Sequence, residues 1–543
     1  MKHMLALAIG LVALTALATG TTVSSGPQIS AFTKAGQSLT LSWQGDSNSN
    51  TTFAIDTASD LMQSNAFAPY RTHVPAGGVI TTCTNPLPPD PGLFYRVVDE
   101  QAAPTNPLGR VVVFSDLHLS PFASHAIVTN LVASPVSAWD AILARDTNGY
   151  CSVDATGMST ANPLLWQSAL ANGQAACPSP DAVLILGDFE YYHFKEYYQL
   201  ITGDMSEPGH QQFLTKMYGY ILMKTAAAFP NTPIYPCLGN NDTFTNDFGI
   251  SVGEDFLAAT APLFYQYGLT GLVSYTDFTA TYTNGGNYAA PFGRGTIVAL
   301  ESIFMSPRSP CNDVPGSNQL AYLSGQLAAC KEGGRGVWIL SHIPSGVRAE
   351  DTWDHWKTGD VNYVETNWRP DFQDPFNSLV AMYPDTVGGM LCGHYHLRTW
   401  QIANDPATSN ATVAIQIMGG LLDNHGDNPA FTVLTYERAT LRILRETTYA
   451  LPKPQYAGKT GPAVWNVLLS MDRGYGLPDL SAASLLTAWS NMAAVGSAGY
   501  NFFLSEYTTG LTPYTPTPTN WPLYRGELRW INAQQFKANV PVP

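Results

Sequence analysis

The chain has 543 residues, too many for one ordinary hydrophobic core, so at least two domains are expected. Hydrophobic residues make up 45% and charged residues only 12%, a globular composition that excludes a long disordered charge block. The formal net charge of −15, without any basic stretch, excludes an electrostatic surface for nucleic-acid polymers, so an anionic substrate would need a local positive centre such as metal ions.

The first residues, MKHMLALAIGLVALTALATG, combine a short basic start, an apolar run and the small-residue triplet that ends at Ala18. This pattern predicts a secretory signal peptide over residues 1–18. The apolar run is shorter than the ~20 residues that a membrane-spanning helix needs. We therefore expect a secreted protein, either extracellular or periplasmic.

Seven cysteines fit an oxidising compartment without indicating a disulfide scaffold. Two pairs bracket loop-like stretches and are predicted disulfides: Cys151 with Cys177, and Cys311 with Cys330. Cys237 and Cys392 lie within apolar runs and are expected to be buried thiols.

Two regions flank the central part of the chain. Residues 26–100 contain short alternating segments such as SLTLSWQ and LFYRVVD, separated by polar turns, which predicts a small β-sandwich domain of the fibronectin-III type. Residues 450–543 carry a helical apolar pattern in DLSAASLLTAWSNMAA, which predicts a helical C-terminal subdomain. The first of these regions contains no obvious catalytic cluster.

Residues 107–449 alternate short apolar runs with longer mixed segments, which predicts an α/β layered domain. The runs are VVVF, AVLIL, PIYPCL, TIVAL, GVWIL and GGMLC. All but TIVAL lead directly into residues that bind metals, in the segments SDLH, GD, GNND, SHIP and GHYH. Because ligands bind beyond the carboxyl ends of parallel strands, these segments predict one shared site.

The candidate ligands all offer a hard or borderline oxygen or nitrogen donor, and none of them is a thiolate. They are Asp116, His118, Asp188, Asn240, His342, His394 and His396. Such a set suits zinc, manganese or iron rather than a structural thiolate site. It is too large for one tetrahedral ion and suits two ions that share a carboxylate, an arrangement that serves in-line displacement at phosphorus.

The five segments, in this order, resemble the signature of the calcineurin-like metallophosphoesterases. The stretches GDFEYYHF, LGNND, LAYLSGQLAACKEGGRGVWILSHIPSG and DNPAFTVLTY are similar to the acid sphingomyelinase-like phosphodiesterases. The resemblance implies a layered β-sandwich core flanked by helices. It also implies that one divalent ion is held by Asp116, His118, Asp188 and His396, and a second by Asp188, Asn240, His342 and His394. Zinc is the expected metal, with manganese or iron as alternatives.

Three departures from the family bear on catalysis. Asn241 stands where the family has a histidine after the asparagine ligand, and Tyr192 stands where it has a histidine four residues after the Gly-Asp aspartate. A β-sandwich also replaces the cysteine-rich helical module of the animal sphingomyelinases. Because asparagine cannot donate a titrating proton, we hypothesise that His193 protonates the leaving oxygen, a role worth ~10²–10⁴-fold in rate.

The sequence therefore predicts a secreted two-metal phosphodiesterase that acts on sphingomyelin or phosphocholine esters, or on nucleotides. Phosphomonoester hydrolysis at the same site is one alternative, and a secreted binding or adhesion protein with a degenerate catalytic domain is another. Contact with a membrane surface is compatible with each. Three tyrosines, Tyr191, Tyr192 and Tyr395, are expected to pack or to wall the substrate. His425 is expected in loop structure, and Arg398 either contacts phosphate or forms a surface pair.

Overall fold

The computed structural model describes residues 108–542 apart from 123, 147–149, 154–158, 246, 453–462, 469 and 512–515, together with the strands between residues 29 and 99. The predicted signal peptide lies outside the described residues. The strands before residue 100 form two antiparallel three-stranded sheets, as expected of an all-β region. They are β1 (Ile29–Ala35), β2 (Ser38–Gln44), β3 (Thr52–Ala58), β4 (Ala68–Pro75), β5 (Ile80–Pro86) and β6 (Phe94–Asp99).

Two six-stranded sheets form the core of the remaining chain. The first has the order β11 (Ile234–Pro236), β10 (Ala182–Ile185), β7 (Leu108–Phe114), β18 (Ala430–Glu437), β19 (Ile443–Ala450) and β20 (Asn466–Val467). The second has the order β12 (Tyr288–Phe292), β13 (Gly295–Leu300), β14 (Val337–Ser341), β15 (Val387–Cys392), β17 (Ala411–Ile417) and β16 (Thr399–Asn404). A short hairpin of β8 (Cys151–Val153) and β9 (Ser159–Ala161) stands apart.

The six apolar runs of the sequence are all strands, which confirms the predicted α/β class. Within the first sheet β7, β10 and β11 are parallel, and within the second β13, β14, β15 and β17 are parallel. Strands such as β10 and β14 are buried along their whole length, as parallel strands covered on both faces must be. The two sheets meet through Trp338, whose ring packs edge-on against Tyr436 with centroids 4.9 Å apart.

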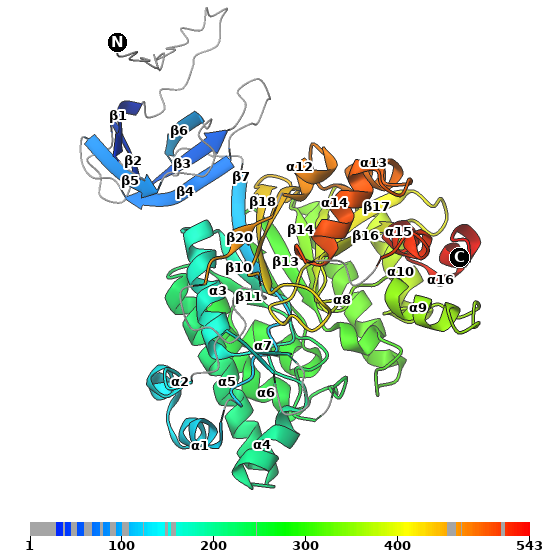
Figure 1. The fold of residues 1–543 in the computed structure, drawn as a ribbon, viewed down its shortest axis with the longest axis horizontal. Coiled ribbons are helices and arrows are strands. Elements are labelled where there is room, and N and C mark those ends of the chain that lie inside the picture. Colours follow the sequence, from blue (N-terminus) through cyan, green and yellow to red (C-terminus); the bar gives the residue numbers. More distant parts are fainter. Residues whose placement is uncertain are drawn as a thin grey trace, which may run out of the picture.

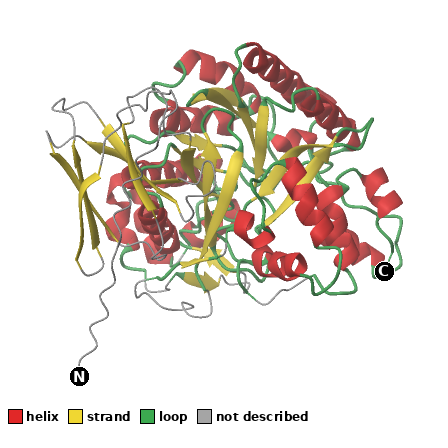
Figure 2. Cartoon of the chain, turned by 90° about the horizontal axis from the view of Figure 1, so that it is seen from above, coloured by secondary structure: helices red, strands yellow, loops and turns green. Residues whose placement is uncertain are grey.

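Helices cover both outer faces of this double sheet (Figures 1 and 2). One group comprises α1 (His125–Ala133), α2 (Trp139–Leu143), α3 (Pro163–Ala176), α4 (Phe194–Thr202), α5 (Glu207–Ala228), α6 (Asp255–Phe264) and α7 (Tyr275–Gly285). The other comprises α8 (Asp313–Glu332), α9 (Ala349–Trp356), α10 (Pro370–Ala381), α12 (Met471–Tyr475), α13 (Ala482–Asn491), α14 (Ala498–Tyr507), α15 (Trp521–Arg529) and α16 (Ala533–Asn539). None of the helices in the described part of the chain is both long and apolar enough to span a membrane.

The predicted disulfides are wrong. Cys177, Cys311 and Cys330 are free thiols. Cys311 precedes α8 and Cys330 lies near its other end, so the helix holds them ~25 Å apart, far beyond the ~7 Å that a disulfide allows between Cα atoms. Cys237 and Cys392 are buried thiols, as expected, and burial raises the pKa of each.

The buried carboxyl group of Glu527 links a C-terminal helix to the start of another helix through a hydrogen bond. Glu527 in α15 is 1% exposed, and its Oε2 accepts a hydrogen bond of 2.6 Å from the backbone N–H of Ala349, where α9 begins. Burial raises the pKa of Glu527 from 4.5 to about 8. The folded chain therefore keeps this proton over a pH range in which the unfolded chain releases it.

We expect the free energy of unfolding to fall as pH rises from 4.5 to about 8, because the unfolded state binds fewer protons than the folded state over this range. The substitution Glu527→Gln should remove part of this slope and raise the melting temperature at pH 8 but not at pH 4.5. Thermal denaturation at both pH values tests this. Exposed Glu332→Gln is the matched control, and identical slopes for the two variants would contradict the assignment.

Candidate metal centre

All seven predicted ligands meet at one edge of the double sheet, just beyond the carboxyl ends of β7, β10, β11, β14 and β15. Each side chain follows the strand that precedes it in the sequence, so the meeting point follows from the parallel pairing of the strands. All are buried except His394, which is partly exposed.

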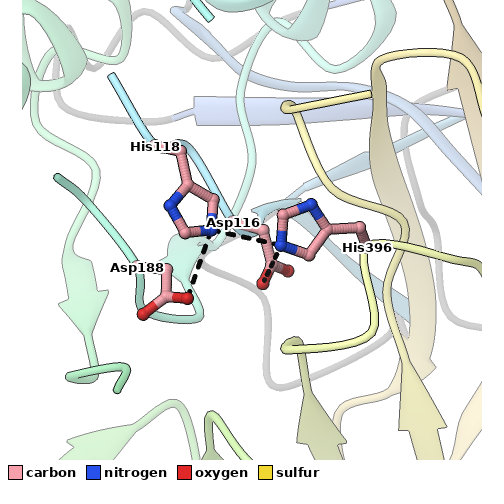
Figure 3. Close-up of side chains that lie close together, drawn as sticks. All are labelled: Asp116, His118, Asp188 and His396. Atoms are coloured by element: carbon pink, nitrogen blue, oxygen red, sulfur yellow. Dashed lines mark hydrogen bonds and ion pairs between the residues drawn. The ribbon is translucent and has the colours of Figure 1, made fainter. Parts of the chain in front are cut away.

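The first group of side chains consists of Asp116, His118, Asp188 and His396, whose ligand atoms all lie within 4.8 Å of one another (Figure 3). The Nε2 atom of His118 is 3.1 Å from Nε2 of His396 and 3.2 Å from Oδ2 of Asp188. Oδ1 of Asp116 lies 3.6 Å from the same His396 nitrogen. Four donor atoms thus converge on one small volume.

The second group consists of Asn240, His342 and His394 together with the carboxylate of Asp188. Oδ1 of Asn240 lies 3.1 Å from Nε2 of His342 and 2.7 Å from Nδ1 of His394. Nε2 of His342 is also 3.2 Å from Oδ2 of Asp188. One oxygen of Asp188 therefore faces both groups at equal distance, the position required of a bridging ligand.

The orientation of two histidine rings indicates that the first group fits a cation. Nδ1 of His118 faces the carbonyl oxygen of Glu190 at 3.0 Å, and Nδ1 of His396 faces that of Leu422 at 3.2 Å. Because a carbonyl only accepts, Nδ1 of each ring is the donor, and Nε2 of each ring is turned toward the other ring and the carboxylates. These two nitrogens lie 3.1 Å apart beside two buried carboxylates, a donor set that a cation would satisfy.

Backbone conformation explains why these side chains converge. Asp116, His118, Asp188, His394 and His396 all have φ between 39° and 73°, in the left-handed region that side chains rarely occupy. Such strain persists only where the surroundings impose it, and it concentrates at functional sites. Two glycines allow the close approach: a Cβ at Gly187 would lie 2.8 Å from Nδ1 of His342, and one at Gly393 would overlap Oγ of Ser115.

The ionisable side chains of the centre shift one another's pKa values. Burial alone would raise the pKa of Asp188, but His342 and His118 outweigh burial and hold it well below its usual value. Burial would likewise lower the pKa of His342, but Asp188 raises it to about 10. Burial and the neighbouring histidines hold the pKa values of His394 and His396 well below the usual range, so both rings are neutral and able to bind metal.

Two neighbouring residues hold the shared carboxylate in place. The backbone and side-chain N–H groups of Asn241 both donate to Asp188, each at 2.9 Å. Asp242 accepts hydrogen bonds from the backbone N–H groups of Asp188, Phe189 and Gly239. The hydroxyl of Tyr218 also donates to Asp242. Burial and then Asp188 raise the pKa of Asp242 to about 6. Asp242 was not singled out from the sequence, although its place in GNND was an available signal.

The other sequence candidates lie in different places. His193 is exposed at the start of α4, and His425 packs edge-on against His396 with centroids 5.2 Å apart. Tyr395 is buried and bonded to Val347 and Asn367, so it packs rather than walls a substrate site. Both expectations for Arg398 are wrong, because it is fully buried and paired with Glu446 and Glu506.

A cavity of about 380 Å³ opens beside the centre. Asn241 and Tyr192 form its boundary with the ligand cluster, and His193 lies on its wall. Glu190, which also lines it, is 5% exposed, and its Oε2 has no hydrogen-bond partner among the described residues. The centre and the cavity together can hold a phosphoryl group and the organic group attached to it.

The relatives described here are all named as phosphodiesterases. No protein-family model matches the chain. A sphingomyelinase phosphodiesterase D of Dictyostelium discoideum is 26% identical over 301 residues, which cover 53% of this chain and 60% of that protein. An acid sphingomyelinase-like phosphodiesterase 3b of Homo sapiens is 24% identical over 288 residues, covering 51% and 60%. The chain thus spans less than two thirds of the length of these two relatives.

One further relative aligns over more of the chain. A cyclic GMP-AMP phosphodiesterase of Rattus norvegicus is 22% identical over 442 residues, which cover 77% of this chain and 88% of that protein. Among solved structures, one titled Structure of PhoD has a TM-score of 0.42 and 11% identity, covering 83% of this chain and 91% of that one.

Proposed function

We propose that this chain, a calcineurin-like metallophosphoesterase of the acid sphingomyelinase-like branch, is a secreted enzyme that hydrolyses phosphodiesters with two divalent metal ions. The observation that carries the proposal is the convergence of the Nε2 atoms of His118 and His396, 3.1 Å apart, with the buried carboxylates of Asp116 and Asp188. Their arrangement favours a bound cation. Zinc suits the nitrogen-rich donor set best, with manganese or iron as alternatives.

The seven candidate ligands would bind two ions in two groups. Asp116, His118, Asp188 and His396 would hold one ion, and Asp188, Asn240, His342 and His394 the other. Such a pair of ions supplies positive charge to the phosphoryl oxygens and activates a water for in-line attack. Asn241 positions the shared carboxylate through its two hydrogen bonds. The cavity beside Tyr192 and His193 receives the organic group of the ester.

The relatives are named as sphingomyelinase-type and cyclic GMP-AMP phosphodiesterases. For this chain we propose two candidate substrate classes, namely sphingomyelin or other phosphocholine esters, and nucleotides. A panel on metal-replete protein separates them: sphingomyelin, phosphocholine esters, ATP, bis-p-nitrophenyl phosphate and p-nitrophenyl phosphate. We expect cleavage of the diesters to exceed that of the monoester. Faster cleavage of p-nitrophenyl phosphate would favour a phosphomonoesterase, and absence of cleavage and of metal binding would favour a binding protein.

We further propose that His193 protonates the leaving oxygen, because its side chain lines the cavity that borders the centre. The substitution His193→Ala should slow the hydrolysis of esters with poor leaving groups by ~10²-fold or more, since these need a proton. Esters of p-nitrophenol, which leave as stable anions, should be slowed little. Steady-state rates on both kinds of ester test this, and equal slowing of the two would exclude His193 as the acid.

A further inference from the structure

The hydroxyl of Tyr192 lies where the first group of ligands meets the cavity. Its ring stacks on His118 with centroids 4.3 Å apart and an angle of 25° between the planes. The stack brings the hydroxyl oxygen to 3.3 Å from Nε2 of His396, a candidate ligand atom of the first group. The same side chain also lines the cavity. Tyr192 therefore touches both the ligand cluster and the space open to a substrate.

The neighbours of this hydroxyl decide where its hydrogen points. The side-chain amide of Asn424 donates to the phenol oxygen at 3.3 Å, so the phenol hydrogen must point elsewhere. The other partner of the hydroxyl is Nε2 of His396, which is free to accept because Nδ1 of that ring carries the proton. The phenol O–H is thus aimed at a ligand atom of the first group.

That acceptor would not be available if Nε2 of His396 held an ion. The phenol hydrogen would then be free to bond to an oxygen of a phosphoryl group held at the first group. A donor left without an acceptor is unfavourable, so an anionic oxygen there would be bound strongly. Ring stacking on His118 fixes the phenol in this orientation before any substrate arrives.

We propose that Tyr192 is a catalytic residue whose hydroxyl donates a hydrogen bond to a phosphoryl oxygen of the substrate at the first group. The inference rests on the proposed phosphodiesterase function and adds a residue to its site. The hydroxyl keeps its proton throughout, so its part differs from that of His193, which donates a proton to the leaving oxygen on the cavity side.

The substitution Tyr192→Phe tests this because it keeps the ring on His118 and removes only the hydroxyl. A hydrogen bond to a charged group contributes ~1.5–3 kcal/mol, equivalent to ~10–100-fold. We expect inorganic phosphate to bind at least ~10-fold more weakly to the metal-replete variant, measured by calorimetry, with kcat on bis-p-nitrophenyl phosphate reduced by a similar factor. Metal content should be unchanged. Asn424→Leu, which removes the amide that orients the hydroxyl, should give a smaller loss in the same direction.

Tyr198→Phe is the matched control, since the hydroxyl of Tyr198 donates to Asp204 at 2.7 Å, outside the centre. Phosphate affinity and kcat in Tyr192→Phe within twofold of this control would overturn the proposal. Loss of a metal ion from Tyr192→Phe would also overturn it, because the hydroxyl would then act as a ligand. If the native enzyme showed no Asp188-dependent hydrolysis, the proposed function would fail. The difference in phosphate affinity would still decide the role of Tyr192.

Discussion

Replacing Asp188 with asparagine is expected to lower the rate of phosphodiester hydrolysis by about 10³-fold or more. Oδ2 of Asp188 lies 3.2 Å from both His118 and His342, so one carboxylate serves both halves of the proposed centre. Metal ions stabilise the charge of such a transition state by several kcal/mol. A loss of ~4 kcal/mol corresponds to about 10³-fold in rate. The measurement is the rate on bis-p-nitrophenyl phosphate together with the metal content of the same sample.

The control for this substitution is Asp385→Asn, which makes the same chemical change at an exposed position outside the centre. An asparagine side chain has nearly the shape of an aspartate side chain, so the fold should persist, and circular dichroism checks that it does. A variant that kept full activity and both ions would show that Asp188 does not bridge two metals.

The substitution Arg398→Met is expected to destabilise the fold by about 3–5 kcal/mol, because it leaves buried carboxylates without their cation. Arg398 lies directly before β16, and its guanidinium pairs with Glu446 of β19 and with Glu506 of α14. All three side chains are buried, at 0%, 1% and 7% exposed. The pairs thus join the two sheets to a C-terminal helix, and their loss should lower the urea concentration at the midpoint of unfolding.

Arg442→Met is the comparison for this variant. Its guanidinium pairs with Glu437 and Asp479 at 3.4 Å each but is 47% exposed, so solvent screens both interactions. Exposed pairs of this kind contribute about 0–1 kcal/mol. Equal shifts in the unfolding midpoint for the two variants would show that the buried pairs around Arg398 do not stabilise the structure as argued.

The parallel part of the fold was predictable because burial on both faces produces continuous apolar runs. Polar residues follow each run, for example after the strands that end at Phe114 and Ile185, and these residues must lie at one edge of the sheet. The candidate ligands followed from the same reasoning. Strands β18 and β19 are antiparallel and form the other side of the first sheet, and no ligand at their ends marks them in the sequence.

Other features depend on contacts between residues far apart in the chain, which a sequence pattern does not contain. Arg398 follows two histidines and was expected near phosphate or at the surface, but its partners lie 48 and 108 residues away. The disulfide prediction for Cys311 and Cys330 is wrong because α8, a long-range consequence of packing, separates the two thiols. The orientation of Tyr192 depends on His118 and Asn424, which come from separate loops.

The most direct test of a two-metal centre is the metal content of the purified protein, determined by mass spectrometry before and after chelation, with hydrolysis of bis-p-nitrophenyl phosphate measured on each sample. We expect two divalent ions per chain, loss of hydrolysis when they are removed, and recovery when zinc or manganese is restored. Hydrolysis that persisted in metal-free protein, or a chain that bound no ion, would contradict the proposed centre.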